Sequence, residues 1–101
     1  MLVIKTRLAR QDIIESAKFI ADDNPEAARR FLIATEETFK LIKTTPNAGS
    51  PERIANQDNL RKWLVKGFTK YAVYYSTLNN EIKIVRVLHT ARDYKRVLFE
   101  K

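Results

Sequence analysis

The sequence predicts an α+β domain of order βααβββ, in which an antiparallel pair of helices packs on a mostly antiparallel four-stranded sheet. Two observations predict this class. Apolar residues recur at helical spacing up to about residue 44, and from about residue 60 they alternate as they do in strands. A chain of 101 residues can bury one hydrophobic core but not two, so we expect a single domain over residues 1–101.

The first half of the chain reads as a strand followed by two helices. LVIK (residues 2–5) is a short apolar run, and Thr6 after it can cap a helix through its hydroxyl group. DDNP (residues 22–25) ends that helix and starts another, because Asn24 suits the N-cap and the proline fits the first helical position. The second helix runs to about Thr44, and the short break between the helices predicts an antiparallel hairpin. The apolar stripe expected on the first helix contains Ala9, Ile13, Ala17 and Ile20, widened by Ile14 and Phe19.

The second half reads as a loop and three strands. TTPNAGSPERIANQDN (residues 44–59) is predicted to be a loop because its prolines and glycine interrupt regular structure. The three strands expected after it are LRKWLVK (60–66), KYAVYYSTL (70–78) and EIKIVRVLH (81–89). Gly67 permits the first turn, and Asn79 and Asn80 tolerate the left-handed geometry of a tight hairpin. The C-terminal residues 90–101 are expected to form a short last helix.

The last hairpin predicts that neither face of the sheet is mainly polar. With a two-residue turn at Asn79-Asn80, Tyr75 faces Ile84, and Val73 faces Arg86. One face then carries Tyr71, Val73, Tyr75, Ile82, Ile84, Arg86 and Leu88, and the other carries Ala72, Tyr74, Lys83, Val85, Val87 and His89. Two helices cannot cover both faces of such a sheet. We therefore expect the second face to bind another chain, or the apolar residues near the C-terminus to fold back over it.

The excess positive charge is confined to the last two-fifths of the chain. Residues 1–60 carry nine basic and nine acidic side chains, whereas residues 61–101 carry ten basic and three acidic ones, which gives the net charge of +7. This asymmetry suggests a nucleic acid or an acidic protein surface as the partner of that half. The alternative is that the charge serves only solubility.

Composition also limits the chemistry. The chain has no cysteine and one histidine, so we expect no disulfide, no metal site and no cofactor. No apolar run approaches the ~20 residues of a membrane helix, and the N-terminal residues do not have the pattern of a signal peptide. We therefore expect a cytoplasmic protein that does not associate with membranes.

Motifs along most of the chain resemble the ParE branch of the RelE/ParE superfamily, the toxins of bacterial type II toxin–antitoxin systems. In the helices the matching residues are Ala9, Asp12, Ile13 and Phe19, then Asn24, Ala28 and Phe31, followed by Pro46 and Gly49. The most specific match is the ending WLVKGFTKYAVYYSTLNNEIKIVRVLHTARD (63–93), which is similar to the family's RVLH-x-x-RD ending. Thr90 stands where the family often has glycine, which is a mild departure.

This resemblance implies the βααβββ fold and a cognate antitoxin that wraps a flexible segment around the toxin's sheet and helices in a hetero-oligomeric complex. ParE-type toxins are described as poisoning DNA gyrase by contact, which makes gyrase the expected target. Their RelE-type relatives cut messenger RNA in the ribosome, which is the alternative. Whether the chain is an enzyme stays open, and the ParE branch favours that it is not.

Candidate site residues follow from these readings. The basic residues and the tyrosine after the last strand are expected to bind the target: Arg92, Tyr94, Lys95 and Arg96. The expected antitoxin contacts are Tyr74, Val85, Val87 and Trp63. A metal-independent ribonuclease would instead need an acid or base and cations for the phosphate, and the available residues are His89, Arg61, Arg86, Arg92 and Tyr94.

Some of these residues also have a structural interpretation. Arg86 can pair with a buried carboxylate such as Asp12 or Asp93, and His89 can make a hydrogen bond at the end of its strand. Trp63, the only tryptophan, is more often a core residue than a binding platform.

Overall fold

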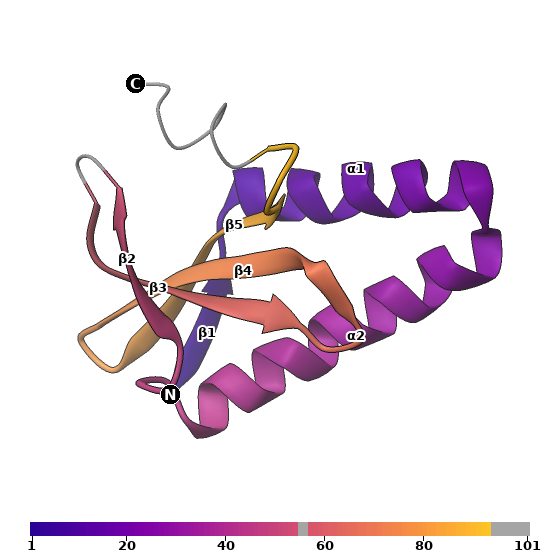
Figure 1. The fold of residues 1–101 in the computed structure, drawn as a ribbon. Helices are drawn as coiled ribbons and strands as arrows, with labels where there is room; N and C mark the ends of the chain where they lie inside the picture. The colour runs from indigo at the N-terminus through magenta and orange to yellow at the C-terminus, as the bar shows by residue number, and fades with distance from the viewer. Residues whose placement is uncertain (55–56, 94–101) are drawn as a thin grey trace.

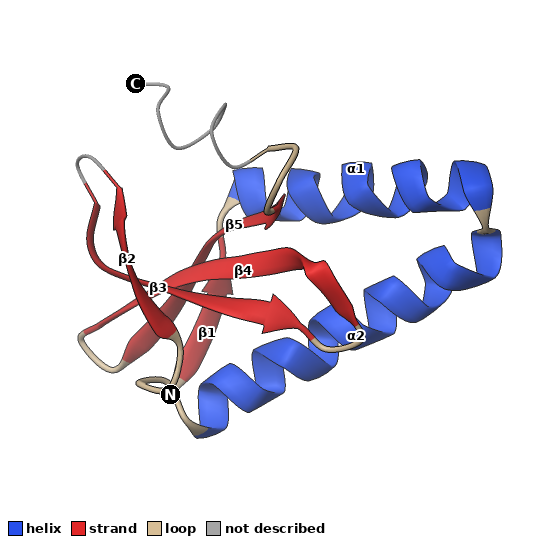
Figure 2. Cartoon of the chain, viewed as in Figure 1, coloured by secondary structure: helices blue, strands red, loops and turns tan. Residues whose placement is uncertain are grey.

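A computed structural model of the chain describes residues 1–54 and 57–93 (Figure 1). Its elements are β1 (Leu2–Lys5), α1 (Arg7–Asp23), α2 (Pro25–Thr44), β2 (Ser50–Ile54), β3 (Gln57–Val65), β4 (Phe68–Leu78) and β5 (Glu81–His89). The strands form one sheet in the order β1-β5-β4-β3-β2, with β1 parallel to β5 and the other pairs antiparallel. The predicted α+β class and the predicted order of elements are confirmed (Figure 2).

The sheet has five strands rather than the four that the sequence predicts. The additional strand, β2, lies in the segment that was expected to be a loop, and β3 begins at Gln57 instead of Leu60. Pro51 is compatible with β2 because an edge strand pairs on one side only and can lack an outward N–H. Pairing with β3 thus overrides the low strand propensity of this polar segment.

The helices begin at the predicted caps. The Oγ1 atom of Thr6 accepts a hydrogen bond from the N–H of Ala9 at 3.0 Å, and the Oδ1 atom of Asn24 accepts one from the N–H of Ala27 at 3.1 Å. Each of these bonds satisfies one of the N–H groups that the first turn of a helix leaves unpaired. The two caps therefore fix where the helical hairpin starts and where it bends.

The predicted turns are also present, but the register of the last hairpin changes part of the way along it. Gly67 has a φ angle of 79°, and Asn79 and Asn80 have φ angles of 52° and 63°, as tight hairpin turns require. Tyr75 faces Ile84 as expected. Beyond this pair Tyr74 faces Arg86, so Val85 is an extra residue in β5 and forms a β-bulge.

Because of the bulge, the faces predicted for Val87 and Leu88 in β5 are wrong. Val73 faces Val87 and not Arg86, while Leu88 faces Ala72. Val87 therefore belongs to the core beneath the helices, and Leu88 belongs to the opposite face. A one-residue insertion has this effect because side chains in a strand alternate between faces.

Most of the hydrophobic core lies between the helices and the near face of the sheet. Its buried residues are Ala9, Phe31, Phe39, Ile42, Val65, Tyr71, Val73, Tyr75, Ile82, Ile84 and Val87. A second, smaller cluster lies on the far face and contains Leu60, Ala72, Tyr74 and Leu88, with Val85 packed against it. The far face is thus apolar as predicted, but the four residues of the small cluster are at most 2 % exposed.

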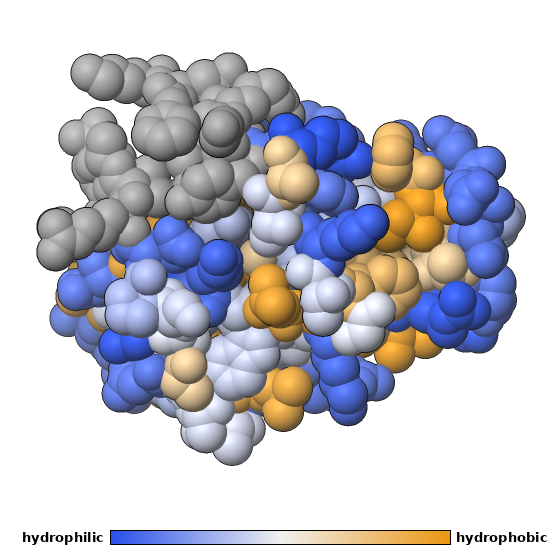
Figure 3. Space-filling view, viewed as in Figure 1, coloured by the Kyte–Doolittle hydropathy of each residue, from blue (hydrophilic) through white to orange (hydrophobic). Residues whose placement is uncertain are grey.

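The helical hairpin leaves apolar side chains on the surface. Figure 3 shows such surface gathered over the helices, beside hydrophilic side chains. The exposed large apolar residues on α1 and α2 are Leu8, Ile14, Phe19, Leu32, Ile33 and Leu41. Ile14 and Phe19, which the sequence assigns to the buried stripe, are 55 % and 59 % exposed. No helix among the described residues is long and apolar enough to cross a membrane.

The expected C-terminal helix cannot be compared with the structure over its whole length. Residues 90–93 form a turn, and residues 94–101 lie outside the described residues.

Candidate functional site

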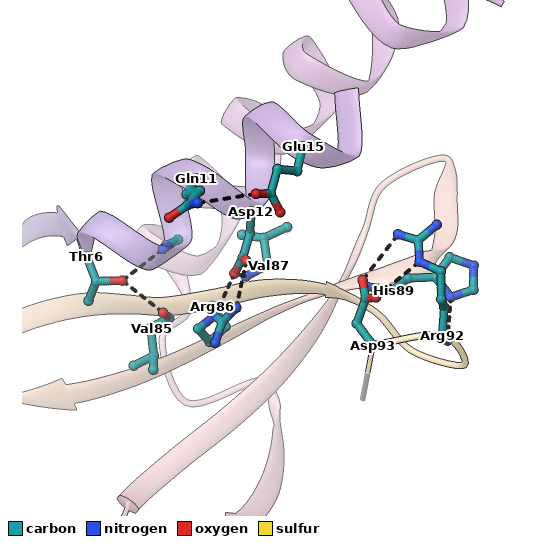
Figure 4. Close-up of polar contacts among 11 residues, drawn as sticks. Thr6, Gln11, Asp12, Glu15, Val85, Arg86, Val87, His89, Arg92 and Asp93 are labelled. Atoms are coloured by element: carbon teal, nitrogen blue, oxygen red, sulfur yellow. Dashed lines mark hydrogen bonds and ion pairs between the residues drawn. The ribbon is translucent and has the colours of Figure 1, made fainter. Parts of the chain in front are cut away.

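A groove of about 410 Å³ runs between α1 and the C-terminal half of β5 (Figure 4). Its lining comes from the helix, the strand and the turn after the strand: Leu8, Gln11, Asp12, Glu15, Ser16, Phe19, Arg86, Val87, Leu88, Arg92 and Asp93. This groove brings together two of the arginines that the sequence singles out, Arg86 and Arg92. It is therefore the candidate site.

The groove exists because α1 continues the role of β1 along the edge of β5. β1 pairs with β5 only as far as Ile84. Past that point the N-cap and a side chain of the helix replace a strand. The Thr6 hydroxyl donates to the Val85 carbonyl at 2.9 Å, and Asp12 Oδ2 accepts from the Val87 N–H at 3.0 Å. Backbone groups at the edge of the strand are thus satisfied without another strand.

Asp12 and Arg86 form the floor of the groove. Arg86 donates from Nε to Asp12 Oδ2 at 2.7 Å and from Nη2 to Asp12 Oδ1 at 2.8 Å. The two side chains are 20 % and 9 % exposed, and this two-bond geometry is the strongest that an arginine and a carboxylate make. Of the partners predicted for Arg86, Asp12 is confirmed. The pair fastens α1 to β5.

His89 caps the turn that follows β5. Its ring atom Nδ1 accepts hydrogen bonds from the backbone N–H groups of Ala91 at 3.2 Å and Arg92 at 3.0 Å. The backbone N–H of His89 donates to Asp93 Oδ2 at 3.2 Å. The ring also meets Tyr71 edge-on, with 5.1 Å between centroids. Burial, followed by the nearby charge of Arg92, lowers the pKa of His89 below its ordinary value.

These contacts assign His89 a neutral ring that carries its proton on Nε2. A general base needs a free lone pair, but the lone pair on Nδ1 already accepts from two amides. An imidazolium acid would have to place a proton on Nδ1 and lose both bonds. The arrangement therefore supports the structural interpretation of His89, a hydrogen bond at the end of the strand.

Arg92 lies at the rim of the groove. Its Nε donates to Asp93 Oδ1 at 3.1 Å, and its guanidinium lies over the Phe19 ring, 4.4 Å from the centroid. The side chain is 40 % exposed, and its bonds to Asp93 raise its pKa above the ordinary value. Arg92 is thus a permanently charged side chain that Asp93 and Phe19 hold in position at the solvent-exposed rim of the groove. The other expected target contacts, Tyr94, Lys95 and Arg96, lie outside the described residues.

The structure does not bring Arg61 to this groove. Its Nη1 donates to the Gly49 carbonyl at 2.7 Å, on the opposite side of β4 from β5. Arg61 faces Tyr75 across the β3–β4 pair, whereas His89 faces Tyr71 across the β4–β5 pair. Four residues of β4 correspond to roughly 13 Å along the strand. The residues expected of a ribonuclease are therefore divided between two places in the described part of the chain.

The expected antitoxin contacts are divided between the two faces of the sheet. Tyr74 is fully buried and Val85 partly buried on the far face. Val87 is 1 % exposed beneath the helices, and Trp63 is partly buried against the same core. Contact of these four residues with an antitoxin stays a prediction.

Sequence reasoning missed Phe19 as a surface residue. Phe19 and Leu8 lie on the groove side of α1 and are 59 % and 44 % exposed. The helical pattern offers no signal for this exposure, because Phe19 follows the buried Ser16 at i,i+3 spacing and both line the same groove. Among the described residues, no group of three His, Cys, Asp or Glu side chains could hold a metal ion.

Comparisons with known proteins concern the family and the fold of the chain. The family model described as "ParE toxin of type II toxin-antitoxin system, parDE" matches residues 3–94. A solved structure, "Chromosomal ParDE TA system from P. aeruginosa", has 20 % sequence identity and a TM-score of 0.70, and the match covers 88 % of this chain and 95 % of that one. At this identity the similarity concerns the fold alone. No curated protein sequence matches.

Proposed function

The chain belongs to the ParE toxin family of type II toxin–antitoxin systems, and from this premise we propose that it inhibits DNA gyrase by protein contact and is neutralised by a cognate antitoxin. The expected complex is hetero-oligomeric and requires no cofactor. Because gyrase acts on the chromosome, we expect the chain to work in the cytoplasm.

The observation that favours contact over catalysis is the state of the polar groups in and beside the groove. His89 uses Nδ1 as a turn cap, and Arg86 uses two of its nitrogens on Asp12. Catalysis by these residues would first have to break bonds that stabilise the fold, whereas a contact surface needs only exposed groups such as Arg92 and Phe19.

The second candidate is a ribosome-dependent messenger RNA endonuclease. It is favoured by the charge of the chain, since residues 61–101 carry all of the excess positive charge, and cations of this density attract phosphate. Arg86 and Arg92 also line one groove, where they could contact two phosphates of a strand.

One experiment separates the two candidates. The purified chain is added to a gyrase supercoiling assay and, in parallel, to a coupled translation reaction in which messenger RNA length is followed. We expect inhibition of supercoiling, intact messenger RNA and continued translation. Cleaved messenger RNA with normal supercoiling would favour the endonuclease, and no effect in either assay would contradict both.

The antitoxin can be tested separately. The reading frame beside the gene is expected to encode a small protein that forms a stable complex with this chain and restores supercoiling when it is added to the gyrase assay. A neighbouring product that neither binds the chain nor restores supercoiling would argue against the proposed pairing.

A further inference from the structure

Phe19 and Arg92 form one exposed surface at the rim of the groove between α1 and β5. The ring comes from the helix and the guanidinium from the turn after the strand, and 4.4 Å separates the guanidinium carbon from the ring centroid. Phe19 is 59 % exposed and the side chain of Arg92 is 40 % exposed. Aromatic residues and arginines are enriched where protein interfaces have most of their binding energy. The Phe19–Arg92 patch therefore has the composition of a contact for another protein.

The cation of this patch is held in a fixed position. Asp93 accepts hydrogen bonds from Nε and Nη2 of Arg92 at 3.1 and 3.2 Å, and it also accepts the backbone N–H of His89 at 3.2 Å. Figure 4 shows these three residues together at the end of β5. Because the arginine is already ordered, binding to it costs less conformational entropy. A guanidinium has more N–H donors than the two bonds to Asp93 use, so donors remain for a ligand.

The groove is not cationic, although the C-terminal part of the chain is. The charged side chains in its described lining are Asp12, Glu15, Arg86, Arg92 and Asp93. Three carboxylates and two guanidiniums give this lining a net charge of −1. The arginines pair with the two aspartates, while Glu15 is exposed and accepts a hydrogen bond from the Gln11 amide at 3.2 Å. Because an excess of cations is what attracts phosphates, a groove of this charge favours a protein ligand over a nucleic acid.

The geometry of α1 places Glu15 beside the Phe19–Arg92 patch. Residues four apart on a helix are neighbours on its surface, and Glu15 and Phe19 both line the groove. An apolar ring, a cation and an anion therefore lie within one area. Charges of both signs around an apolar contact select a partner with the complementary charges and disfavour other partners.

We propose that the toxin contacts its target protein through this area, and that the target presents a matching set of groups: an apolar side chain against Phe19, a carboxylate to Arg92 and a basic side chain to Glu15. This contact rests on the proposed function, since such a surface is used only if the toxin acts on a protein. Phe19, which the sequence assigns to the buried stripe, is then the central anchor of the interface.

Truncation of Phe19 tests the apolar contact. Phe19→Ala is compared with Ile14→Ala in two assays: inhibition of gyrase supercoiling by the purified chain, and growth arrest in cells that lack the antitoxin. We expect Phe19→Ala to be about tenfold less potent, as for an anchor residue of an interface, and Ile14→Ala to change potency less than about twofold. Wild-type potency of Phe19→Ala in both assays would overturn the proposal.

Ile14 is the matched control for Phe19. It is 55 % exposed on the same helix, but it is not among the described residues that line the groove. Both variants should unfold at the urea midpoint of the wild type, because both side chains are exposed. A loss of potency in Phe19→Ala alone is then due to the surface and not to the fold.

A double-mutant cycle tests whether Phe19 and Arg92 act as one surface. If the ring positions the guanidinium for the target, removal of either side chain disrupts the same contact. Phe19→Ala combined with Arg92→Gln should therefore be less than about threefold weaker than the weaker of the two single variants. Phe19→Leu keeps an apolar side chain and should lose less potency than Phe19→Ala. Losses that multiply in the double variant would show two independent contacts and would contradict a single patch.

Reversal of the charge at Glu15 separates a protein ligand from a nucleic acid, because the two ligands require opposite signs. Glu15→Lys should lower potency roughly fivefold if the target offers a basic side chain, whereas it should strengthen binding to phosphates. Asp22→Lys makes the same change of charge at an exposed position of the same helix and should leave potency within about twofold of the wild type. Higher potency of Glu15→Lys would indicate a polyanionic ligand and would overturn the proposal, and potency equal to that of Asp22→Lys would also contradict it.

Failure of this proposal can be told apart from failure of the proposed function. A wild-type chain that arrests growth without inhibiting gyrase would show that gyrase is not the target, and growth arrest would still test the patch. A wild-type chain that inhibits gyrase, with Phe19→Ala and Glu15→Lys equally inhibitory, would support the target and exclude the patch. A wild-type chain with neither effect would contradict both.

Discussion

Arg86 and Asp12, 74 residues apart in the sequence, form an ion pair with two hydrogen bonds of 2.7 and 2.8 Å. The same carboxylate accepts the N–H of Val87 at 3.0 Å. One side chain of α1 therefore binds both the backbone and a side chain of β5, at the point where β1 no longer covers that strand. This carboxylate therefore fastens α1 to β5 within the groove.

Replacement of Asp12 should be among the more damaging single changes. Asp12→Ala leaves the half-buried guanidinium of Arg86 and the N–H of Val87 without this acceptor. Removal of one partner from a buried pair typically costs 3–5 kcal/mol, and because Arg86 is 20 % exposed we expect a loss of about 3 kcal/mol in the free energy of unfolding. Urea unfolding measures it.

Two variants check the cause of that loss. Asp12→Asn keeps an acceptor for the N–H of Val87 but loses the charge. Its free energy of unfolding should therefore lie between those of the wild type and Asp12→Ala. Glu15→Ala changes an exposed carboxylate on the same helix and should stay within about 0.5 kcal/mol. A cost below about 1 kcal/mol for Asp12→Ala would show that α1 is held by packing alone.

The elements that could be predicted from the sequence are those fixed by local chemistry. Thr6 and Asn24 cap the helices because a hydroxyl or amide oxygen can reach the first free N–H groups of the turn. Asn79 and Asn80 form the hairpin turn because they tolerate positive φ angles. The partner of Arg86 could be narrowed to two carboxylates, since a cation among apolar neighbours needs an opposite charge.

The features that could not be predicted depend on contacts between distant segments. The bulge at Val85 is not marked by a glycine or proline, and it moves Val87 to the opposite face from the one expected. β2 has the sequence SPERI, with a proline and three polar residues, and it forms because β3 is available to pair with it. The role of His89 as a turn cap depends on the path of the chain after the strand.

The stability of the fold should depend on the ionisation of His89. Because burial lowers the pKa of His89 in the native state, the native chain binds fewer protons than the unfolded chain between that lowered pKa and about 6.5. The free energy of unfolding should therefore rise with pH across this window. The contribution is fully present above about pH 6.5 and is lost as the pH falls through the native pKa.

Urea midpoints measured from pH 5 to pH 8 test this dependence. His89→Gln removes the titrating group, so the difference between the wild type and this variant isolates the histidine from the carboxylates. We expect the difference to grow from pH 5 to about pH 7 and then to level off. A difference that does not change with pH would show that His89 titrates alike in the folded and unfolded chains.

The same variant also tests whether His89 takes part in chemistry. If the chain acts by contact, His89→Gln should leave growth arrest nearly unchanged at equal amounts of folded protein. Loss of a general acid or base typically lowers a rate 10²–10⁴-fold, so an enzyme would lose its toxicity. Growth after induction of each form gives the answer, and full loss of arrest with a stable fold would favour the endonuclease.

Arg92 is expected to contribute to target binding. Arg92→Gln removes an exposed cation at the rim of the groove and should weaken inhibition of gyrase several-fold, with little effect on folding. Arg29→Gln is the matched control, because Arg29 is also exposed and also pairs with a nearby carboxylate, that of Glu26, but lies on α2. Equal effects of both variants would exclude a specific role for Arg92. If the ligand is RNA instead, the affinity of the chain for it should fall steeply with salt.

Gly49 and Tyr75 make a clasp that holds the loop between α2 and β2 on the sheet. The Tyr75 hydroxyl accepts from the Gly49 N–H at 3.1 Å and donates to the Pro46 carbonyl at 2.8 Å. A Cβ atom at position 49 would lie 2.3 Å from that hydroxyl oxygen, so Gly49→Ala must displace a fully buried ring. We expect a cost of about 2 kcal/mol from this overpacking.

Tyr75→Phe keeps the ring and removes the hydroxyl, and it should cost about 1–2 kcal/mol for the two hydrogen bonds. The double variant, Gly49→Ala with Tyr75→Phe, shows whether the two costs are independent. Without the hydroxyl the new methyl group meets only ring carbons at 3.0 Å, so the combined cost should be about 1 kcal/mol less than the sum of the single costs. Strict additivity in urea unfolding would mean that Gly49→Ala acts on the loop itself, and not through its contact with Tyr75.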